Sequence, residues 1–294
     1  MKLSKCIDEA KGWPFAFAEC DAEKLKVRVL LKDHLEDVAR LSKLIFEERF
    51  TPAVVRGIDP RLFDKVDPAE VAYITGLIHD LGKASKYYLN SFTDRGRLTF
   101  PYHELVASVV ILNAIDEYAV ELEDHVLAVG DLVSKIISRH HSAMPSRHPL
   151  EVISGEGRRK QEMVRIVQAV EAMCDNLVVK FIEELLSKCG SFNVCSTILK
   201  LLSRHLKSSD GCERLARELH SLIARLTEFN RLSGMGEVSS EDTYRLVAIY
   251  TGILMVADNI VATKEGRLSD DRLSPLYVKH WMKELREIIS KHST

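Results

Sequence analysis

The chain has 294 residues, of which 46% are hydrophobic, so it can bury a sizeable core and is too apolar for a disordered protein. Its 41 basic and 43 acidic residues give a formal net charge of -2, which excludes a general electrostatic attraction to nucleic acid or membrane. The first residues contain no apolar signal segment, no run approaches the roughly 18 apolar residues of a membrane span, and the six cysteines form no C-x-x-C pair. We therefore expect a reduced, cytoplasmic protein that does not enter a membrane.

Helical periodicity runs along the whole chain. Apolar residues recur at i, i+3, i+4 and i+7, and sustained strand alternation is absent. The stretch from about Cys189 to Ser240 is more polar and Ser-rich, as an appended subdomain would be. These patterns predict an all-α fold for residues 1–294. The expected helices are Val27–Phe50, Pro68–Lys83, His103–Ile115, Asp124–His141, Gly157–Lys188, Cys212–Leu232, Glu241–Thr263 and, near the end, Pro275–Lys291.

Polar groups that are costly to bury lie on apolar helix faces. His34 shares a face with Val38, and His103 shares one with Val106. Asp258 lies on an apolar face with no Lys or Arg one turn to either side. A buried carboxylate costs several kcal/mol unless a cation pairs with it, and a metal ion would serve. Taken singly, an inward-facing histidine such as His34 or His103 is usually a satisfied core residue.

The segment ITGLIHDLGKASKYY ends a buried helix on His79, Asp80 and Lys83. A His-Asp pair alone is expected about 0.7 times by chance in this composition, but His-Asp-x-Gly-Lys only about 0.002 times. The ordinary explanation makes Gly82 a helix C-cap with Lys83 solvated beyond it. That explanation leaves open why His34, His79-Asp80, His103, His140-His141 and Asp258 all fall at helix ends or on apolar faces.

The order H…HD-x-G-K…H…HH…D resembles the metal-binding signature of the HD superfamily of phosphohydrolases, and most of all the HD nuclease component of type I CRISPR interference. HDLGKASKYYLNSF and ADNIVAT are similar to two segments of that family. The resemblance implies an HD-domain helical bundle, with additional helices inserted at about 157–240 before the last metal-ligand helix. It also implies two metal ions and a bridging, catalytic Asp80. One ion would take His34, His79 and Asp258, and the other His103, His140 and His141.

The implied chemistry is metal-activated attack of water on phosphorus, with Lys83 reaching a phosphate oxygen or the leaving group. Imidazole ligands favour Mn²⁺, Ni²⁺, Co²⁺ or Fe²⁺, and Mg²⁺ stays open. Aromatic residues between the metal motifs suit either base stacking or the core, and His148 is an accessory group or a surface residue. The aromatic residues are Tyr87, Tyr88, Phe92, Phe100 and Tyr102. Basic residues that would either follow a DNA strand or form a solvated face are Arg139, Arg147, Arg158, Arg159 and Lys160.

No P-loop pattern occurs, so the resemblance implies a stand-alone nuclease that acts with a separately encoded helicase subunit and a guide-RNA surveillance complex. Single-stranded DNA is then the expected substrate, whether the enzyme cuts as an endonuclease or an exonuclease. One alternative is an HD phosphohydrolase of nucleotides or cyclic dinucleotides, although the Gly-Tyr-Pro element expected of the latter is missing after His141. A non-enzymatic helical interaction module is the other alternative.

Overall fold

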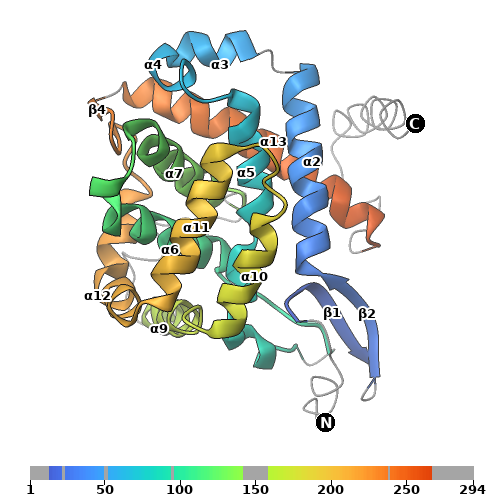
Figure 1. Cartoon of the computed structure of the whole chain (residues 1–294). Helices are drawn as coiled ribbons and strands as arrows, with labels where there is room; N and C mark the ends of the chain where they lie inside the picture. The colour runs from blue at the N-terminus through green and yellow to red at the C-terminus, as the bar shows by residue number, and fades with distance from the viewer. Residues whose placement is uncertain are drawn as a thin grey trace.

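The computed structural model describes residues 13–21, 24–49, 52–93, 96–141, 158–237 and 239–266. Helices dominate these residues, which confirms the all-α prediction (Figure 1). The strands are β1 (Phe15–Asp21), β2 (Lys24–Leu30), β3 (Arg231–Leu232) and β4 (Gly236–Glu237). The α-helices are α2 (Leu31–Arg49), α3 (Pro52–Ile58), α4 (Pro60–Phe63), α5 (Pro68–Ile78), α6 (His103–Glu117), α7 (Asp124–Ile137), α9 (Arg158–Glu171), α10 (Asn176–Leu186), α11 (Asn193–Lys207), α12 (Ser209–Arg225) and α13 (Ser240–Lys264). Three 3-10 helices are η1 (Leu81–Ala84), η2 (Lys86–Asn90) and η3 (Ala119–Glu121).

An antiparallel hairpin of β1 and β2 precedes the first long helix and lies at one end of the molecule (Figure 1). The helix predicted from Val27 is therefore wrong at its start, because β2 continues to Leu30 and α2 begins at Leu31. Polar and apolar residues alternate from Lys24 to Val29, which is the period of a strand. The sequence carried this signal, and the longer helical pattern that follows it obscured it.

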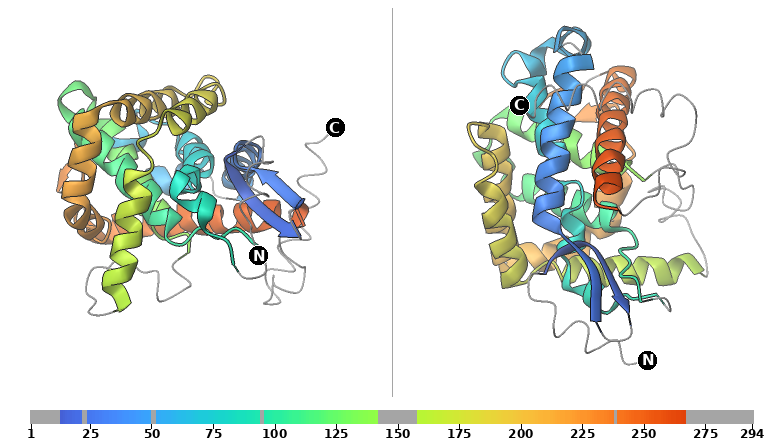
Figure 2. Two further views of the ribbon diagram at one scale, coloured as in Figure 1. Left: turned by 90° about the horizontal axis from the view of Figure 1, so that it is seen from below. Right: turned by 90° about the vertical axis from the view of Figure 1, so that its right-hand side faces the viewer.

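Helices α5 and α6 form the centre of the core. Every residue of α5 is buried, and α6 is buried from His103 to Ile115. Helix α2 packs along α5, α13 packs along α2, and α7 packs against α6 (Figures 1 and 2). A helix that is apolar on all sides needs other elements around it. The polar groups at the end of α5 are consequently held in the interior.

In a second group of helices, α9, α11 and α12 pack against α6, and α10 packs against α11 (Figure 1). The single helix predicted for Gly157–Lys188 is wrong, because α9 ends at Glu171 and the Asp175 side chain caps a new helix by accepting from the Leu177 N–H. The Ser-rich stretch contains α11, which was not predicted and whose apolar face is buried. The apolar residues of these helices belong to the same continuous core as α5 and α6.

Several predicted helix ends shift. The chain leaves α5 after Ile78 and α7 after Ile137, so His79 and His140 follow their helices instead of belonging to them. The helix expected for Cys212–Leu232 is α12, which starts at Ser209 and stops at Arg225 before the β3–β4 hairpin. The final helix expected at Pro275–Lys291 lies outside the described residues, as do Arg147 and His148.

Disulfides replace the reduced cysteines expected from the sequence. Cys174 bonds to Cys212 with an S–S distance of 2.04 Å, and Cys189 bonds to Cys195. The first pair links the segment that precedes α10 with helix α12. The second pair closes the turn between α10 and α11. Separations of 38 and 6 residues leave no C-x-x-C pattern, so these pairings follow from the tertiary structure.

The expectation that no segment resembles a membrane span is wrong for helix α13. By length and composition it alone among the described helices could span a membrane, but 56% of its most apolar window is buried within the protein. Its neighbours are α2, α5 and α7. These contacts are those of a core helix.

Candidate metal centre

The His-Asp pair sits where α5 gives way to a tight turn. Asp67 caps the start of α5 through the Ala69 N–H, and Pro68 occupies the first helical position. At the other end, His79 remains in the helical conformation while Asp80 begins the 3-10 turn η1. Asp80 is 1% exposed and His79 is fully buried. A rigid apolar helix therefore delivers a carboxylate to the interior.

Two glycines allow the surrounding backbones to approach closely. A Cβ on Gly82 would lie 2.0 Å from the carbonyl oxygen of His103, and a Cβ on Gly76 would lie 2.7 Å from the Ala39 Cα. The interpretation of Gly82 as a left-handed C-cap is wrong, since η1 continues through it without a positive φ. Glycine is required here because there is no room for a side chain. Without one, the start of α6 can lie against the His-Asp turn.

Asp80 lies at the centre of four imidazoles. Its Oδ1 is 2.8 Å from His103 Nε2 and 3.6 Å from His140 Nε2. Its Oδ2 is 3.5 Å from His34 Nε2 and 3.4 Å from His79 Nε2. Each carboxylate oxygen thus faces a different pair of histidines.

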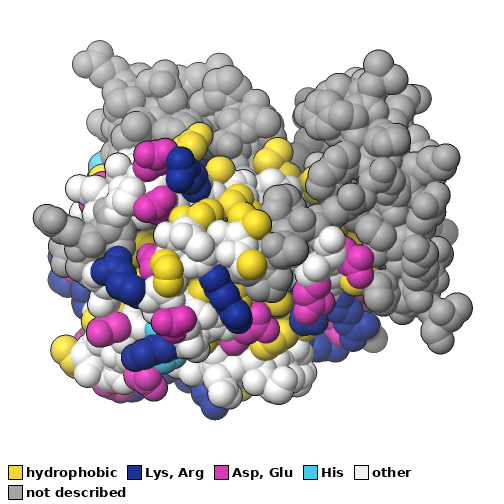
Figure 3. All heavy atoms as spheres, turned by 90° about the horizontal axis from the view of Figure 1, so that it is seen from above, with side chains coloured by type: hydrophobic (Ala, Val, Ile, Leu, Met, Phe, Trp, Pro, Cys, Tyr) yellow, Lys and Arg dark blue, Asp and Glu magenta, His cyan; other side chains and the backbone are white. Residues whose placement is uncertain are grey.

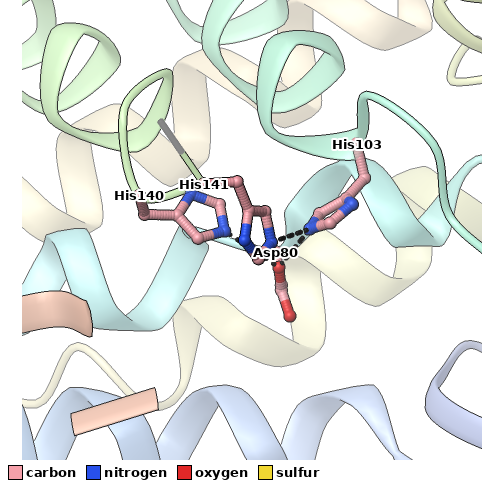
Figure 4. Close-up of side chains that lie close together, drawn as sticks. All are labelled: Asp80, His103, His140 and His141. Atoms are coloured by element: carbon pink, nitrogen blue, oxygen red, sulfur yellow. Dashed lines mark hydrogen bonds and ion pairs between the residues drawn. The ribbon is translucent and has the colours of Figure 1, made fainter. Parts of the chain in front are cut away.

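The remaining two predicted residues complete the two sides. Asp258 Oδ1, on α13, is 3.2 Å from His34 Nε2 and 3.9 Å from His79 Nε2. His141 Nε2 is 3.3 Å from His103 Nε2, and Figure 4 shows His103, His140 and His141 gathered around Asp80. Five segments far apart in the sequence meet at this point.

Backbone carbonyls fix the orientation of three rings. Nδ1 of His79 donates to the Gly76 carbonyl at 2.9 Å, Nδ1 of His103 to Phe100 at 2.6 Å, and Nδ1 of His140 to Ile137 at 2.7 Å. A carbonyl only accepts, so the proton of each neutral ring is on Nδ1 and the lone pair on Nε2. The Nε2 atoms turned toward Asp80 are then available to bind a cation.

The ionisation states favour cation binding. Burial would raise the pKa of Asp80, but the charges of His79 and Lys83 hold it well below its usual range. Burial lowers the pKa of both His103 and His141, so these rings are neutral at pH 7. Asp80 is therefore an ionised carboxylate and His103 and His141 are neutral imidazoles, which are the forms that ligate metals.

His34 and His140 differ from His103 and His141. The Asp80 carboxylate raises the pKa of His140 against the effect of its burial. Carboxylates act on His34 in the same way. Burial alone would lower its pKa, but neighbouring carboxylates, Asp258 above all, raise it to about 10. Its Nδ1 also lies 3.1 Å from Oε1 of Glu265, just beyond the last turn of α13. A metal ion binding at His34 Nε2 must therefore displace a proton.

The arrangement fits two divalent cations. The ligand atoms of Asp80, His103, His140 and His141 all lie within 4.8 Å of one another, and so do those of His34, His79, Asp80 and Asp258. Asp80 is the residue that the two groups share. Nε2 of His79, Nε2 of His140 and Oδ1 of Asp80 are buried without a hydrogen-bond partner among the described residues. Buried acceptors of this kind need a cation, and a carboxylate has two oxygens with which to bridge two of them.

Lys83 contacts Asp80 directly, and this ion pair was not predicted from the sequence. Its ammonium group pairs with Asp80 Oδ2 and lies 5.4 Å above the Phe100 ring, and the side chain is buried. Among the aromatic residues between the motifs, Tyr88 and Tyr102 are core residues, and the Tyr88 hydroxyl donates to the Pro101 carbonyl. Tyr87, Phe92 and Phe100 are partly buried.

The proposed nucleic-acid cluster is only partly within the described residues. Arg139 precedes His140, half-buried, and its guanidinium lies 4.5 Å from the centre of the Phe229 ring. Arg158, Arg159 and Lys160 form the first turn of α9. On the face shown in Figure 3, basic and acidic side chains are intermingled, and the coloured atoms show no extended basic surface.

Two features of the site were not found from the sequence. Glu265 contacts His34 from outside the ligand motif. Its only signal in the sequence is its position two residues after ADNIVAT. Tyr102 has a φ of 61°, the left-handed conformation that non-glycine residues rarely adopt, and it immediately precedes His103. This turn starts α6 at the ligand. Strained backbone of this kind is frequent at functional sites.

A helical bundle in which a central His-Asp pair, histidines from three other segments and an aspartate of α13 converge defines a metal-dependent phosphohydrolase of the HD superfamily. The family model described as "Cas3, HD domain" matches residues 19–265, which is most of the chain. The chain belongs to this family, the HD nucleases of type I CRISPR systems, and it is accordingly a metal-binding hydrolase. Searches of curated proteins and of solved structures give no significant match.

Proposed function

We propose that this protein is the nuclease subunit of type I CRISPR interference and cleaves phosphodiester bonds in single-stranded DNA with two metal ions. The observation that carries the proposal is the division of Asp80: one oxygen faces His103 and His140, and the other faces His34 and His79. A single ion would not need both oxygens of one buried carboxylate turned to separate sets of imidazoles. Asp258 and His141 complete the two sets.

The residues of the chain have distinct roles in this scheme. Bound divalent ions would lower the pKa of water and stabilise charge on the phosphoryl oxygens. The imidazoles are neutral ligands, so they leave most of the positive charge of the site available to phosphate. Lys83, which pairs with Asp80, is close enough to the centre to turn toward a phosphate oxygen when the carboxylate is occupied.

Donor chemistry favours particular metals. The seven proposed ligands comprise five imidazoles and two carboxylates, a set that suits Mn²⁺, Ni²⁺, Co²⁺ or Fe²⁺ better than the all-oxygen shell of Mg²⁺. No cysteine belongs to either group, which argues against a structural zinc site. We expect Mn²⁺ or Ni²⁺ to support the activity.

The family supports a DNA substrate in a CRISPR system. In this proposal a separately encoded helicase unwinds the duplex and passes a single strand to the nuclease. The guide-RNA surveillance complex would select the target. Both partners belong to the proposal.

The test compares substrates and variants under identical conditions. Purified protein with Mn²⁺ is incubated with labelled single-stranded DNA, duplex DNA, RNA and cyclic dinucleotides. Asp80→Ala and Asp80→Asn should lose both metal ions and reduce cleavage by about 10³-fold or more, while circular dichroism shows a folded protein. Asp210→Ala, which removes an exposed carboxylate at the start of α12, is the matched control and should behave as the unaltered protein.

Two results would reject the proposal. Hydrolysis confined to cyclic dinucleotides would move the protein to the phosphodiesterases of that superfamily. Stoichiometric retention of two ions by Asp80→Ala would show that this carboxylate does not bridge them.

A further inference from the structure

Arg139, two residues after the end of α7, forms a cluster with two aromatic rings from later segments. The guanidinium of Arg139 lies 4.5 Å from the Phe229 ring centre. The Phe229 ring in turn meets Tyr244 at 5.7 Å between centroids and 81° between planes. Three segments, the end of α7, the loop after α12 and the start of α13, contribute one residue each.

Arg139 differs from the other cations on this side of the protein. Lys135, one turn earlier on α7, pairs with Asp131, and Arg225 pairs with Asp116. Arg139 has no carboxylate partner in the described part of the chain, and its Nε is buried without a hydrogen-bond acceptor. A half-buried guanidinium without a carboxylate partner favours the binding of an anion from outside the protein.

Tyr244 supplies an accessible aromatic surface. It is 54% exposed, and it is the one aromatic residue among the large exposed hydrophobic side chains of the described residues. Phe229 is only partly buried and holds Tyr244 edge-on. An exposed ring that is fixed by a second ring can stack on an unpaired base at little cost in conformational freedom.

The position of this cluster relates it to the site. Arg139 is directly followed by His140, whose Nε2 lies 3.6 Å from Asp80 Oδ1. Neighbouring Cα atoms are about 3.8 Å apart, so the backbone that carries the guanidinium also carries a proposed ligand. Tyr244 precedes Asp258 by 14 residues on α13, which is about 21 Å along the helix, so a base stacked on Tyr244 would lie several nucleotides from the scissile phosphate.

We propose that Arg139, Phe229 and Tyr244 form a strand platform that binds single-stranded nucleic acid several nucleotides away from the metal centre. In this platform the Arg139 guanidinium pairs with a backbone phosphate, the Tyr244 ring stacks on a base, and Phe229 orients both. This inference rests on the proposed nuclease function and specifies how its substrate is held. A duplex, whose bases are already stacked on each other, gains only the phosphate contact.

Equilibrium binding without metal separates this inference from catalysis. The anisotropy of a fluorescent oligothymidylate is measured with full-length protein in excess chelator, so that no cleavage occurs. Tyr244→Ala should weaken binding about 5- to 150-fold, the range found for loss of one base-stacking contact, and Tyr244→Phe should keep most of the affinity. Arg139→Gln should weaken binding and reduce the slope of log affinity against log salt by about 0.7.

Arg217→Gln is the matched control, because it removes one exposed positive charge from α12 without touching the platform. Metal content and circular dichroism of each variant establish that the fold is kept. If the unaltered protein cleaves and binds single-stranded DNA while Tyr244→Ala and Arg139→Gln bind as it does, the platform is wrong and the nuclease function stands. If the unaltered protein neither binds nor cleaves single-stranded DNA, the proposed function is wrong and the platform with it.

Discussion

The helices that carry the metal centre and the helices α9 to α12 are stabilised in opposite ways. Around Asp80, charged and polar groups are buried in the middle of the core and are tied to backbone carbonyls and to each other. In α10 to α12, charged residues face outward, one apolar face of each helix is buried, and disulfides join the segments. The first region uses its interior for chemistry, and the second uses its interior only for packing.

This contrast indicates where the stability of the protein resides. Burying several imidazoles and a carboxylate without metal is unfavourable, so we expect bound cations to stabilise this region. The outer helices need no ligand, because apolar burial and covalent links hold them. We therefore expect the two regions to respond differently to reduction, to substitution and to pH.

Breaking the disulfide between Cys174 and Cys212 should have the largest effect on stability. A link across 38 residues restricts the unfolded chain by about 4 kcal/mol, so the double variant Cys174→Ser/Cys212→Ser should lose stability of that order. Chemical denaturation measures it, and calorimetric titration with Mn²⁺ should show unchanged metal affinity. The shorter link of Cys189 and Cys195 should contribute about 2 kcal/mol, so a larger loss in that variant would contradict the loop-length argument.

Gly82→Ala tests the other region. Its Cβ would lie 2.0 Å from the His103 carbonyl oxygen, so the start of α6 must move, at a cost of about 2–3 kcal/mol and with loss of metal affinity. Thermal denaturation and metal titration report the two effects. Gly252→Ala is the matched control, since a Cβ there meets nothing within 4 Å and should stabilise α13 by about 1 kcal/mol. Unchanged metal affinity in Gly82→Ala would show that the close approach of α6 to Gly82 is not needed for metal binding.

The third expected effect is the pH dependence of the metal-free protein. The pKa of His34 is about 10 in the folded chain and about 6.5 in the unfolded chain. A raised folded pKa stabilises the protein fully below pH 6.5, and this contribution falls as the pH rises from 6.5 toward 10. Denaturation in chelator across this range should show the decline.

Metal affinity should change in the opposite direction, because the cation replaces the His34 proton, by up to about tenfold per pH unit. Titration in buffers of different ionisation enthalpy counts the released proton. His205→Asn is the control: burial lowers the pKa of His205, which lies in the outer helices, so its removal should not alter the dependence above pH 6.5. Metal affinity that stays constant from pH 7 to 9 would contradict a protonated His34.

The sequence by itself determined the helical fold, the family and the order of the candidate residues. Helical period and the rare HDLGK pattern are local properties of the chain, and with the family resemblance they identified all seven residues that converge. The resemblance also divided them into the two groups that the geometry shows. Local patterns were weakest at boundaries, where the strand before Leu31 and the break before Asp175 were missed.

Tertiary structure alone decided the rest. The pairing of Cys174 with Cys212, the contact of Glu265 with His34 and the meeting of Arg139 with Phe229 join positions that share no periodic relation in the sequence. Gly82 belongs to the sequence motif, but the need for glycine there is explained only by the His103 carbonyl, which lies against it. Spacing along a helix fixes which side chains share a face, but only the packing of one helix against another fixes what that face meets.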